Sequence, residues 1–238
     1  MILNILHLYP KEMNLYGDHG NILTLRKRCE WRGIKTRVIA HEPGDPIPND
    51  VDIIFGGGGQ DSGQSRIEKD LIHIAPDLKE LVDSGTPTLV VCGLYQLFGE
   101  YFETSEGQKI QGINILGVTT KGGPTRMIGN ITINTPEFGE IVGYENHSGL
   151  TTLKEGTLAF GTVVSGAGNN GEDMTEGARY KNCIGTYLHG PVLPKNPRVA
   201  DFLIMKALER KTGKARKLDT LNDRIEQQAH KVAASRPR

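Results

Sequence analysis

A cysteine at the end of an apolar run is the residue with the clearest chemical potential in this chain. Cys92 follows Leu-Val-Val, and Gly93 opens a stretch with helical character. A cysteine on such a strand-to-helix turn points its sulfur out of the sheet, and the positive end of the following helix favours the thiolate. The alternative is a small buried hydrophobic side chain at a strand end, because free cysteine is among the most buried residue types. This segment alone favours the two interpretations equally.

A run of four glycines at residues 56–59 directly follows the apolar run 51–55. Glycines at the end of a strand let backbone N–H groups approach a phosphate or a developing oxyanion. The run contains no GxxxxGK[ST] loop, and no GxGxxG fingerprint with its acidic residue follows the first apolar run, so neither standard nucleotide site is expected. We therefore predict an oxyanion hole formed by the N–H of Gly57 or Gly58 together with that of Gly93.

A thiol nucleophile requires an imidazole that takes and returns its proton, and the chain has seven histidines. His189 ends an apolar run and precedes Gly-Pro, so its ring is expected at a sheet edge, as for Cys92. His147 lies in a polar turn that suits a binding loop. We favour His189 as the base, although spacing leaves His147 open. His19 could also be functional, whereas the other four are expected to be structural or solvated: His7, His41, His73 and His230.

Several motifs resemble class I (triad-type) glutamine amidotransferase domains of the cobyric-acid-synthase-like branch. They are Cys92-Gly93-Leu94-Tyr95-Gln96, the glycine run with Gln60-Asp61, Gly143-Tyr144-Glu145-Asn146-His147 and Gly185-Thr186-Tyr187-Leu188-His189-Gly190-Pro191. Two further motifs resemble the stand-alone glutaminase subunits of that branch: Asn14-Leu15-Tyr16-Gly17-Asp18 with Gly20-Asn21, and Glu30-Trp31-Arg32-Gly33. The motifs fall in the family's order, and the resemblance extends to about Lys211.

The resemblance implies that the chain hydrolyses L-glutamine to glutamate and ammonia through a thioester on Cys92, with His189 as acid and base. Arg126 matches the family's substrate-binding arginine, and a guanidinium is a natural partner for the glutamine α-carboxylate. Gln96 matches a family glutamine that lines the same pocket. No cofactor and no metal are expected in this chain.

The resemblance also implies a partner, because joining ammonia to a carboxylate needs ATP and the chain has no Walker-type loop. The expected partner is a Mur-ligase-like subunit of the MurT type, which would bind ATP and Mg and form a heterodimer with this chain. It would amidate the α-carboxylate of D-glutamate in the lipid II stem peptide. The complex is expected in the cytoplasm, peripheral to the inner face of the membrane, with no nucleic acid as partner.

Two positions depart from the family pattern. Val90 stands where many class I domains have a glycine, two residues before the nucleophile. Pro191 stands where the usual triad has a glutamate, two residues after the histidine. Either Cys92 and His189 work as a pair alone, or the carboxylate that orients His189 comes from elsewhere; we propose the partner subunit as its source.

Three alternatives share parts of these motifs. The first is a cobyrinate-type amidotransferase subunit, and the second is a non-catalytic subunit that binds a ligase through a basic tail. The presence of Cys92, His189 and Arg126 together disfavours the second. The third is a Cys-dependent peptidase or a chaperone-like α/β protein, which would share the turn at Cys92 but would not need Arg126 for glutamine.

The elements that must position these residues follow from the apolar periodicity. Short β-branched runs that alternate with longer helical patterns are typical of a parallel sheet flanked by helices. The pattern predicts strands at 3–9, 36–41, 51–55 and 87–92 and helices at 20–32, 67–84 and 93–103. Further short strands are predicted at 113–117, 127–132, 141–144, 158–164 and 183–188. The predicted fold class is α/β: a flavodoxin-like, mostly parallel sheet flanked by helices, with added β structure.

An amphipathic helix at 197–211 closes a predicted domain at 1–211, and residues 212–238 form a basic tail or helix. The segment 210–238 carries nine Lys/Arg and three Asp/Glu, a net charge of +6, which leaves −6 for the remainder of a chain with 28 residues of each sign. Such a tail could dock a partner or an anionic surface, but a solvated terminal helix is the more economical interpretation.

The remaining composition excludes several classes of protein. Three cysteines without a CxxC pair argue against a disulfide framework and against a zinc site. No apolar stretch approaches the roughly 18–20 residues that a membrane span needs. The N-terminus lacks a basic region and a small-residue cleavage site, so no signal peptide is expected and the chain is predicted to be cytoplasmic.

Overall fold

A six-stranded sheet forms the centre of the molecule. The computed structural model describes residues 1–15 and 17–237 of the chain, so Tyr16 and Arg238 lie outside the described residues. The strand order is β11-β12-β4-β3-β1-β2. The strands are β1 (Ile2–Leu8), β2 (Lys35–His41), β3 (Ile53–Gly56), β4 (Thr88–Val91), β11 (Ala178–Tyr180) and β12 (Cys183–Thr186). All pairings are parallel except that of β11 with β12. The predicted mostly parallel α/β sheet is confirmed.

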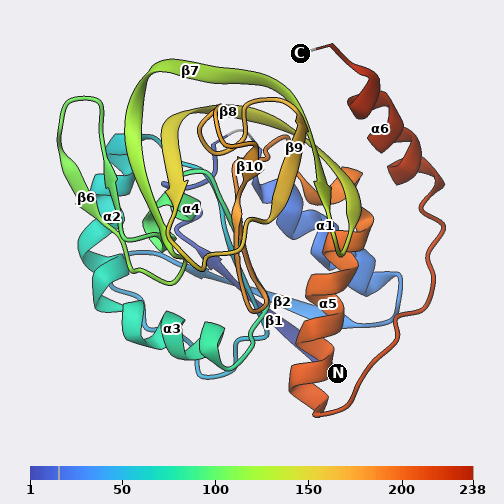
Figure 1. The fold of residues 1–238 in the computed structure, drawn as a ribbon. Helices are drawn as coiled ribbons and strands as arrows, with labels where there is room; N and C mark the ends of the chain where they lie inside the picture. The colour runs from blue at the N-terminus through green and yellow to red at the C-terminus, as the bar shows by residue number, and fades with distance from the viewer. Residues whose placement is uncertain (16, 238) are drawn as a thin grey trace.

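Helices cover both faces of this sheet, which explains why β3, β4 and β12 are buried at every position. The helices are α1 (His19–Glu30), α2 (Asp61–His73), α3 (Ala75–Asp83), α4 (Gly93–Phe98) and α5 (Pro197–Thr212), with a 3-10 turn η1 (Leu193–Lys195). Helical crossovers run from β1 to β2 and, in the opposite direction along the sheet, from β3 to β4. They place α1 opposite α2 and α3, and α5 packs beside α1 (Figure 1).

Two of the predicted helices are shorter than the periodicity suggested. The helix predicted over 67–84 is two helices that meet at Ile74, because Pro76 lies at the start of α3 and cannot continue the hydrogen bonding of α2. The helix predicted over 93–103 ends at Phe98, where Gly99 turns the chain into extended backbone. The α2 helix also begins earlier than predicted, at Asp61, with only Gln60 between it and the glycine run.

A second sheet carries a long hairpin (Figure 1). Its strands are β5 (Tyr101–Glu103), β6 (Lys109–Gln111), β7 (Val118–Thr135), β8 (Gly139–Leu153), β9 (Gly161–Ser165) and β10 (Thr175–Glu176). The strand predicted at 127–132 lies in the second half of β7 and the one at 141–144 near the start of β8, and 113–117 contains no strand. The hairpin is longer than predicted because its residues alternate between buried and exposed, so no continuous apolar run marks its ends.

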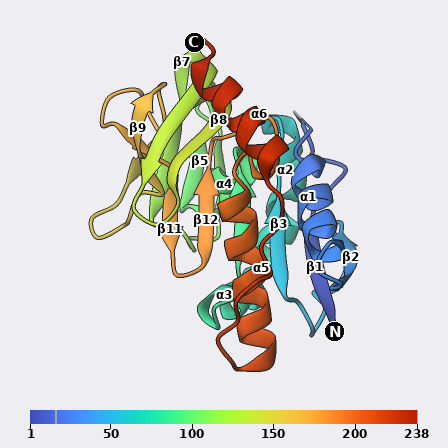
Figure 2. The same ribbon diagram turned by 90° about the vertical axis from the view of Figure 1, so that its right-hand side faces the viewer.

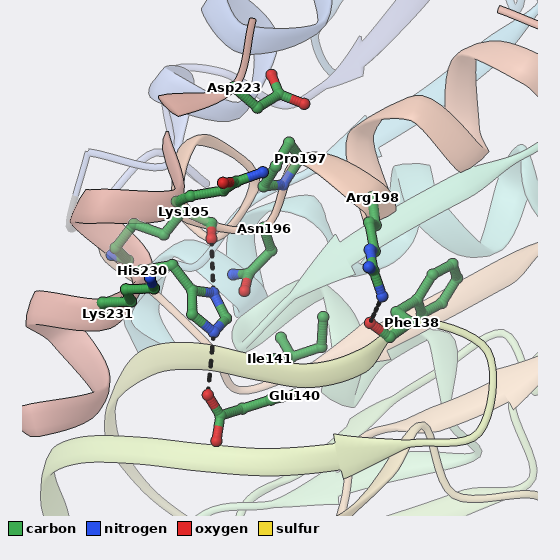
Figure 3. Close-up of a pocket in the computed structure, with 11 residues that line it drawn as sticks. Phe138, Glu140, Ile141, Lys195, Asn196, Pro197, Arg198, Asp223, His230 and Lys231 are labelled. Carbon is green, nitrogen blue, oxygen red and sulfur yellow. Dashed lines mark hydrogen bonds and ion pairs between the residues drawn. The ribbon is translucent and has the colours of Figure 1, made fainter. Parts of the chain in front are cut away.

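The chain ends in the helix α6 (Arg224–Ser235), which has no buried residue. The α6 helix lies beside β7, β8 and η1, apart from the body of α5 (Figure 2). A cavity of about 350 Å³ lies between part of α6 and the rest of the protein, where Phe138, Ile141 and Pro197 line it (Figure 3). Among the described residues, no helix combines the length and apolar character of a membrane span. The division between a domain at 1–211 and a tail stays a prediction; α5 ends nearby, at Thr212.

Candidate active site

Four segments that follow parallel strands meet at the carboxyl edge of the central sheet. The strand order places the residues after β12, β4, β3 and β1 next to one another. These segments hold His189, Cys92, Gly57–Gly59 and Asp18, respectively. Ligand sites of open α/β sheets lie at this edge, because the loops there are free of the sheet's own hydrogen bonding. The fold therefore brings together three of the sequence-predicted segments and one residue that was not predicted.

The turn at Cys92 has the strained backbone of a nucleophile elbow. Cys92 has φ 50° and ψ −106°, a conformation that non-glycine residues rarely adopt, and it immediately precedes α4. The side chain is nearly buried, with 6% of its surface exposed. The strain fixes the sulfur at the start of the helix, so the predicted elbow is present despite Val90.

Glycines on the neighbouring strands explain why Val90 is tolerated. Val90 pairs with Gly56 of β3 on one side and with Gly185 of β12 on the other, so all three lie on one face of the sheet. A Cβ on Gly56 would lie 2.2 Å from Leu94 Cδ1, and one on Gly185 would lie 2.2 Å from Tyr95 Cδ2. The close approach of α4 is therefore provided by glycines beside the nucleophile strand.

A carboxylate from this chain faces the histidine. His189 Nδ1 lies 3.3 Å from Oδ1 of Asp18, and the two residues are 1% and 0% exposed. Burial disfavours the charged imidazole, but the Cys92 sulfur and the Asp18 carboxylate outweigh that cost and raise the pKa of His189 to about 10. The ring is therefore protonated at neutral pH and can donate to a leaving group.

The expectation that the partner supplies this carboxylate is wrong for the described arrangement. Asp18 reaches His189 from the loop after β1, which lies next to β3 and its glycine run. The sequence carried a signal: Asp18 belongs to a family-like motif directly after the first strand. The family pattern places the carboxylate two residues after the histidine, where this chain has Pro191, so the spacing around His189 gave no indication of Asp18.

The glycine run packs directly on the catalytic pair. A Cβ on Gly58 would lie 2.9 Å from Cε1 of His189 and 3.2 Å from Cβ of Cys92. However, the Gly58 N–H donates to Oδ2 of Asp18 at 2.7 Å, so it is not available to an oxyanion as predicted. The amide nitrogen of Gly59 lies against Gly93, where a Cβ would be 3.0 Å from it. The Gly59 and Gly93 amides therefore lie close together beside Cys92 and are the candidates for the oxyanion, and the role of Gly57 stays a prediction.

His147, the alternative base, lies in the same cavity but is held neutral. Its ring stacks on Tyr187 at a centroid separation of 3.5 Å and an interplanar angle of 4°. Burial lowers the pKa of His147 to about 3, despite the Nδ1 contact of 2.9 Å with the Gly149 carbonyl. His19 is exposed at the start of α1 and stacks on His7. The geometry therefore favours His189 over His147 as the base, and the role itself stays a prediction.

A cavity of about 460 Å³ opens over Cys92 and is lined by Arg126 and Gln96 among others. Arg126 lies at a break in the pairing of β7 with β8, and its Nε donates to Oδ1 of Asn146 at 2.6 Å. Gln96 accepts from Gln64 Nε2 at 2.8 Å and donates to the Tyr187 hydroxyl at 3.1 Å. These bonds fix which end of the Gln96 amide faces each neighbour, so both predicted substrate-binding residues lie at the reacting cysteine.

Within the part of the chain that the structure describes, no group of three His, Cys, Asp or Glu side chains could hold a metal ion. Cys29 and Cys183 are free and buried, and burial raises the pKa of Cys29 to about 12. Neither thiol is placed to react.

Comparison with known proteins supports the same chemistry. Residues 4–197 match the CobB/CobQ-like glutamine amidotransferase domain. The chain is 45% identical over 210 residues to the lipid II isoglutaminyl synthase (glutamine-hydrolyzing) subunit GatD of Staphylococcus aureus (strain N315), covering 88% of this chain and 86% of that protein. It is 39% identical over 229 residues to GatD of Streptococcus pneumoniae (strain ATCC BAA-255 / R6), covering 95% and 88%.

A solved structure described as a glutamine amidotransferase has a TM-score of 0.59 to this fold, at 13% identity. The match covers 85% of this chain and 98% of that one. At this identity the likeness concerns the fold alone.

Proposed function

This chain belongs to the CobB/CobQ-like glutamine amidotransferase family, and we propose that it is the glutamine-hydrolysing subunit of a lipid II isoglutaminyl synthase. The observation that carries the chemistry is the strained turn at Cys92 beside a His189 that faces Asp18. The observation that supports the pathway is the identity of 45% and 39% to two GatD subunits over most of their length.

The first half of the reaction follows from the charges at the site. The Cys92 thiolate attacks the side-chain carboxamide carbon of glutamine, and the oxygen becomes an anion that the N–H groups of Gly59 and Gly93 can bind. When the intermediate collapses, the C–N bond breaks and His189 gives its proton to the departing nitrogen. Ammonia leaves, and the acyl group stays on Cys92 as a thioester.

The second half reverses the proton transfer. Neutral His189 takes a proton from water, the hydroxide attacks the thioester carbon, and the C–S bond breaks to release glutamate and the thiolate. Asp18 transfers no proton in either half; its role is to accept from the Nδ1 side of the ring and keep Nε2 toward the reacting atoms. The cycle consumes one water and leaves the enzyme unchanged.

The ammonia requires an acceptor activated elsewhere. We place the ATP and Mg chemistry in a MurT-like Mur ligase subunit, which would phosphorylate the α-carboxylate of D-glutamate in the lipid II stem peptide before ammonia attacks. Lipid II is membrane-bound, so the complex would work at the inner face of the membrane. The net charge of +6 at the C-terminal end suits an anionic surface or an acidic partner.

The experiment that tests this proposal is amidation by the complex. A tagged copy of the chain is co-purified with its ligase partner, and lipid II is offered with ATP and glutamine. We expect amidated lipid II and glutamate in equal amounts. Cys92→Ala should abolish the glutamine-dependent reaction, at least about 10⁴-fold as for other nucleophile replacements. The same variant should still amidate lipid II when ammonium chloride replaces glutamine.

The possible outcomes separate the alternatives. Glutamine hydrolysis with a partner that ignores lipid II but amidates a corrinoid carboxylate would favour the cobyrinate-type subunit. Full amidation by Cys92→Ala with glutamine would favour a non-catalytic subunit. Failure of the ammonium control would instead indicate that Cys92→Ala had damaged the complex, which Cys92→Ser would check.

A further inference from the structure

The cavity over Cys92 has three walls built from separate parts of the chain. Its floor is the elbow, with Cys92 and Gln96. One side is the hairpin of β7 and β8, which contributes Arg126 and residues 146–149. The other side is the glycine run and the first turn of α2, with Asp61 at the start of that helix. A ligand whose reacting end lies at Cys92 therefore extends between the hairpin and α2.

The charges on these two sides are opposite. Among the described residues that line the cavity, Asp61 is the only acidic side chain and Arg126 the only one with a permanent positive charge, since His147 is neutral. Arg126 is already oriented by its bond to Asn146. Within the described residues, the exposed Asp61 carboxylate has no hydrogen-bond or ion-pair partner. A carboxylate on a cavity wall that has no such partner can accept a hydrogen bond from a ligand.

Glutamine carries a carboxylate and an ammonium group on its α-carbon. If Arg126 binds the α-carboxylate, the ammonium needs an acceptor within the same cavity, because burying an unpaired charge is costly. We propose that Asp61 binds the α-ammonium group of glutamine, so that the site selects a free α-amino acid over other primary amides. This inference rests on the proposed glutaminase activity and adds a specificity residue to it.

A purely structural role for Asp61 makes a different prediction. An acidic residue in the first turn of a helix interacts favourably with the helix dipole whether or not a ligand is present. Asp77 provides the matched control, since it is also an exposed aspartate in the first turn of a helix, α3, and lies away from the cavity. Asp61→Asn and Asp77→Asn therefore remove the same charge from equivalent helical positions.

The experiment compares two substrates that differ only in the ammonium group. Glutamate or glutarate release is measured for the complex with L-glutamine and with its desamino analogue, the monoamide of glutaric acid. We expect Asp61→Asn to raise KM for glutamine about tenfold, the scale of one charge-assisted contact, with kcat nearly unchanged. The analogue should be unaffected, Asp61→Glu should recover part of the loss, and Asp77→Asn should behave as wild type. If the analogue is hydrolysed too slowly, its Ki as a competitive inhibitor serves as the comparison.

Two results would overturn the inference. Equal losses for glutamine and the analogue would assign Asp61 a structural role in α2, and no loss for either would remove it from the substrate site. A wild-type complex that does not hydrolyse glutamine would instead contradict the proposed function. Failure of the Asp61 inference and failure of the proposed function are therefore distinguishable.

Discussion

The carboxyl edge of the central sheet and the C-terminal helix are held to the protein in opposite ways. At the edge, side chains pack without room: Asp18 and His189 are buried, and a methyl group on Gly56 or Gly185 would collide with α4. In contrast, α6 has no buried residue, and a cavity of about 350 Å³ lies beneath it. The site is thus preorganised by dense packing, whereas α6 is attached at its surface.

Polar contacts hold α6 in place. His230 of α6 contacts two other elements: its Nδ1 lies 2.9 Å from the Lys195 carbonyl of η1, and its Nε2 lies 3.2 Å from Oε1 of Glu140 in β8 (Figure 3). Asp223, just before α6, pairs with buried Arg28 at 2.6 Å. The Glu140 partner of His230 is exposed, so that contact contributes little free energy because water competes for the same groups. The pair with buried Arg28 comes from Asp223, which precedes the helix itself. The comparison predicts that changes at the edge are costly and that changes in α6 are not.

The largest effect should come from Asp18. Asp18→Asn keeps the shape of the side chain but removes the charge that faces Nδ1 of His189. The ring loses the group that fixes its tautomer and one of the two neighbours, Cys92 and Asp18, that raise its pKa. We expect kcat for glutamine hydrolysis to fall about 10⁴-fold, as for the equivalent change in other triads. Glutamate release is measured for the chain alone and with its partner.

Asp83→Asn is the control for Asp18→Asn, because Asp83 pairs with Lys181 at the opposite end of the sheet. It should leave hydrolysis unchanged. If the partner restored full activity to Asp18→Asn, the orienting carboxylate would lie in the partner after all.

The next effect concerns the packing of α4 on the sheet. Gly185→Ala places a methyl group where Tyr95 and Leu116 already lie, at 2.2 Å and 2.6 Å, and should lower the free energy of unfolding by about 1–3 kcal/mol. Val232→Ala, a change of similar size on α6, should alter it by less than about 0.5 kcal/mol. Urea unfolding measures both.

A double variant sharpens this test of packing. Adding Tyr95→Leu makes room for the methyl group, so the double variant should be less destabilised than the sum of the two single changes. Strict additivity would mean that Gly185 is not needed for the approach of α4.

The sequence predicted that Cys92 and His189 meet because each residue follows its own parallel strand, β4 or β12, and therefore lies at the same edge. It did not predict Asp18, because the contact depends on β1 lying next to β3, which is a property of strand order and not of spacing. It also assigned the Gly58 N–H to the oxyanion, since only the structure shows that Asp18 accepts from it. The length of β7 and β8 was missed because alternating burial leaves no apolar run.

A third effect follows from the buried imidazole of His147. The folded-state pKa of about 3 lies below the usual 6.5, so the neutral ring contributes its full stability above pH 6.5 and loses it as pH falls toward 3. Between pH 6.5 and 5 this group should cost about 2 kcal/mol of unfolding free energy. In urea unfolding, the free energy of unfolding should rise less for His147→Gln than for the wild-type protein when the pH is raised from 5 to 7. The buried His7 is present in both proteins, so an unchanged pH dependence would exclude His147 as a source.

The smallest effect is expected from removing α6. A chain that ends at Asp223 keeps the ion pair with Arg28 and loses only surface contacts, so the unfolding free energy should fall by less than about 1 kcal/mol. Lys195 still donates to the Gly190 carbonyl at 2.7 Å, next to His189, because this bond comes from η1 and not from α6. Glutamine hydrolysis by the complex should therefore stay within about twofold of the full chain, the effect of a typical surface change. Suppose that the shortened chain is as stable as the full chain but hydrolyses glutamine much more slowly. Then α6 positions His189 through the Lys195 carbonyl, and the proposed difference between the sheet edge and α6 is wrong. His230→Ala distinguishes that case, because it removes the same contact to Lys195 while leaving the rest of α6 in place.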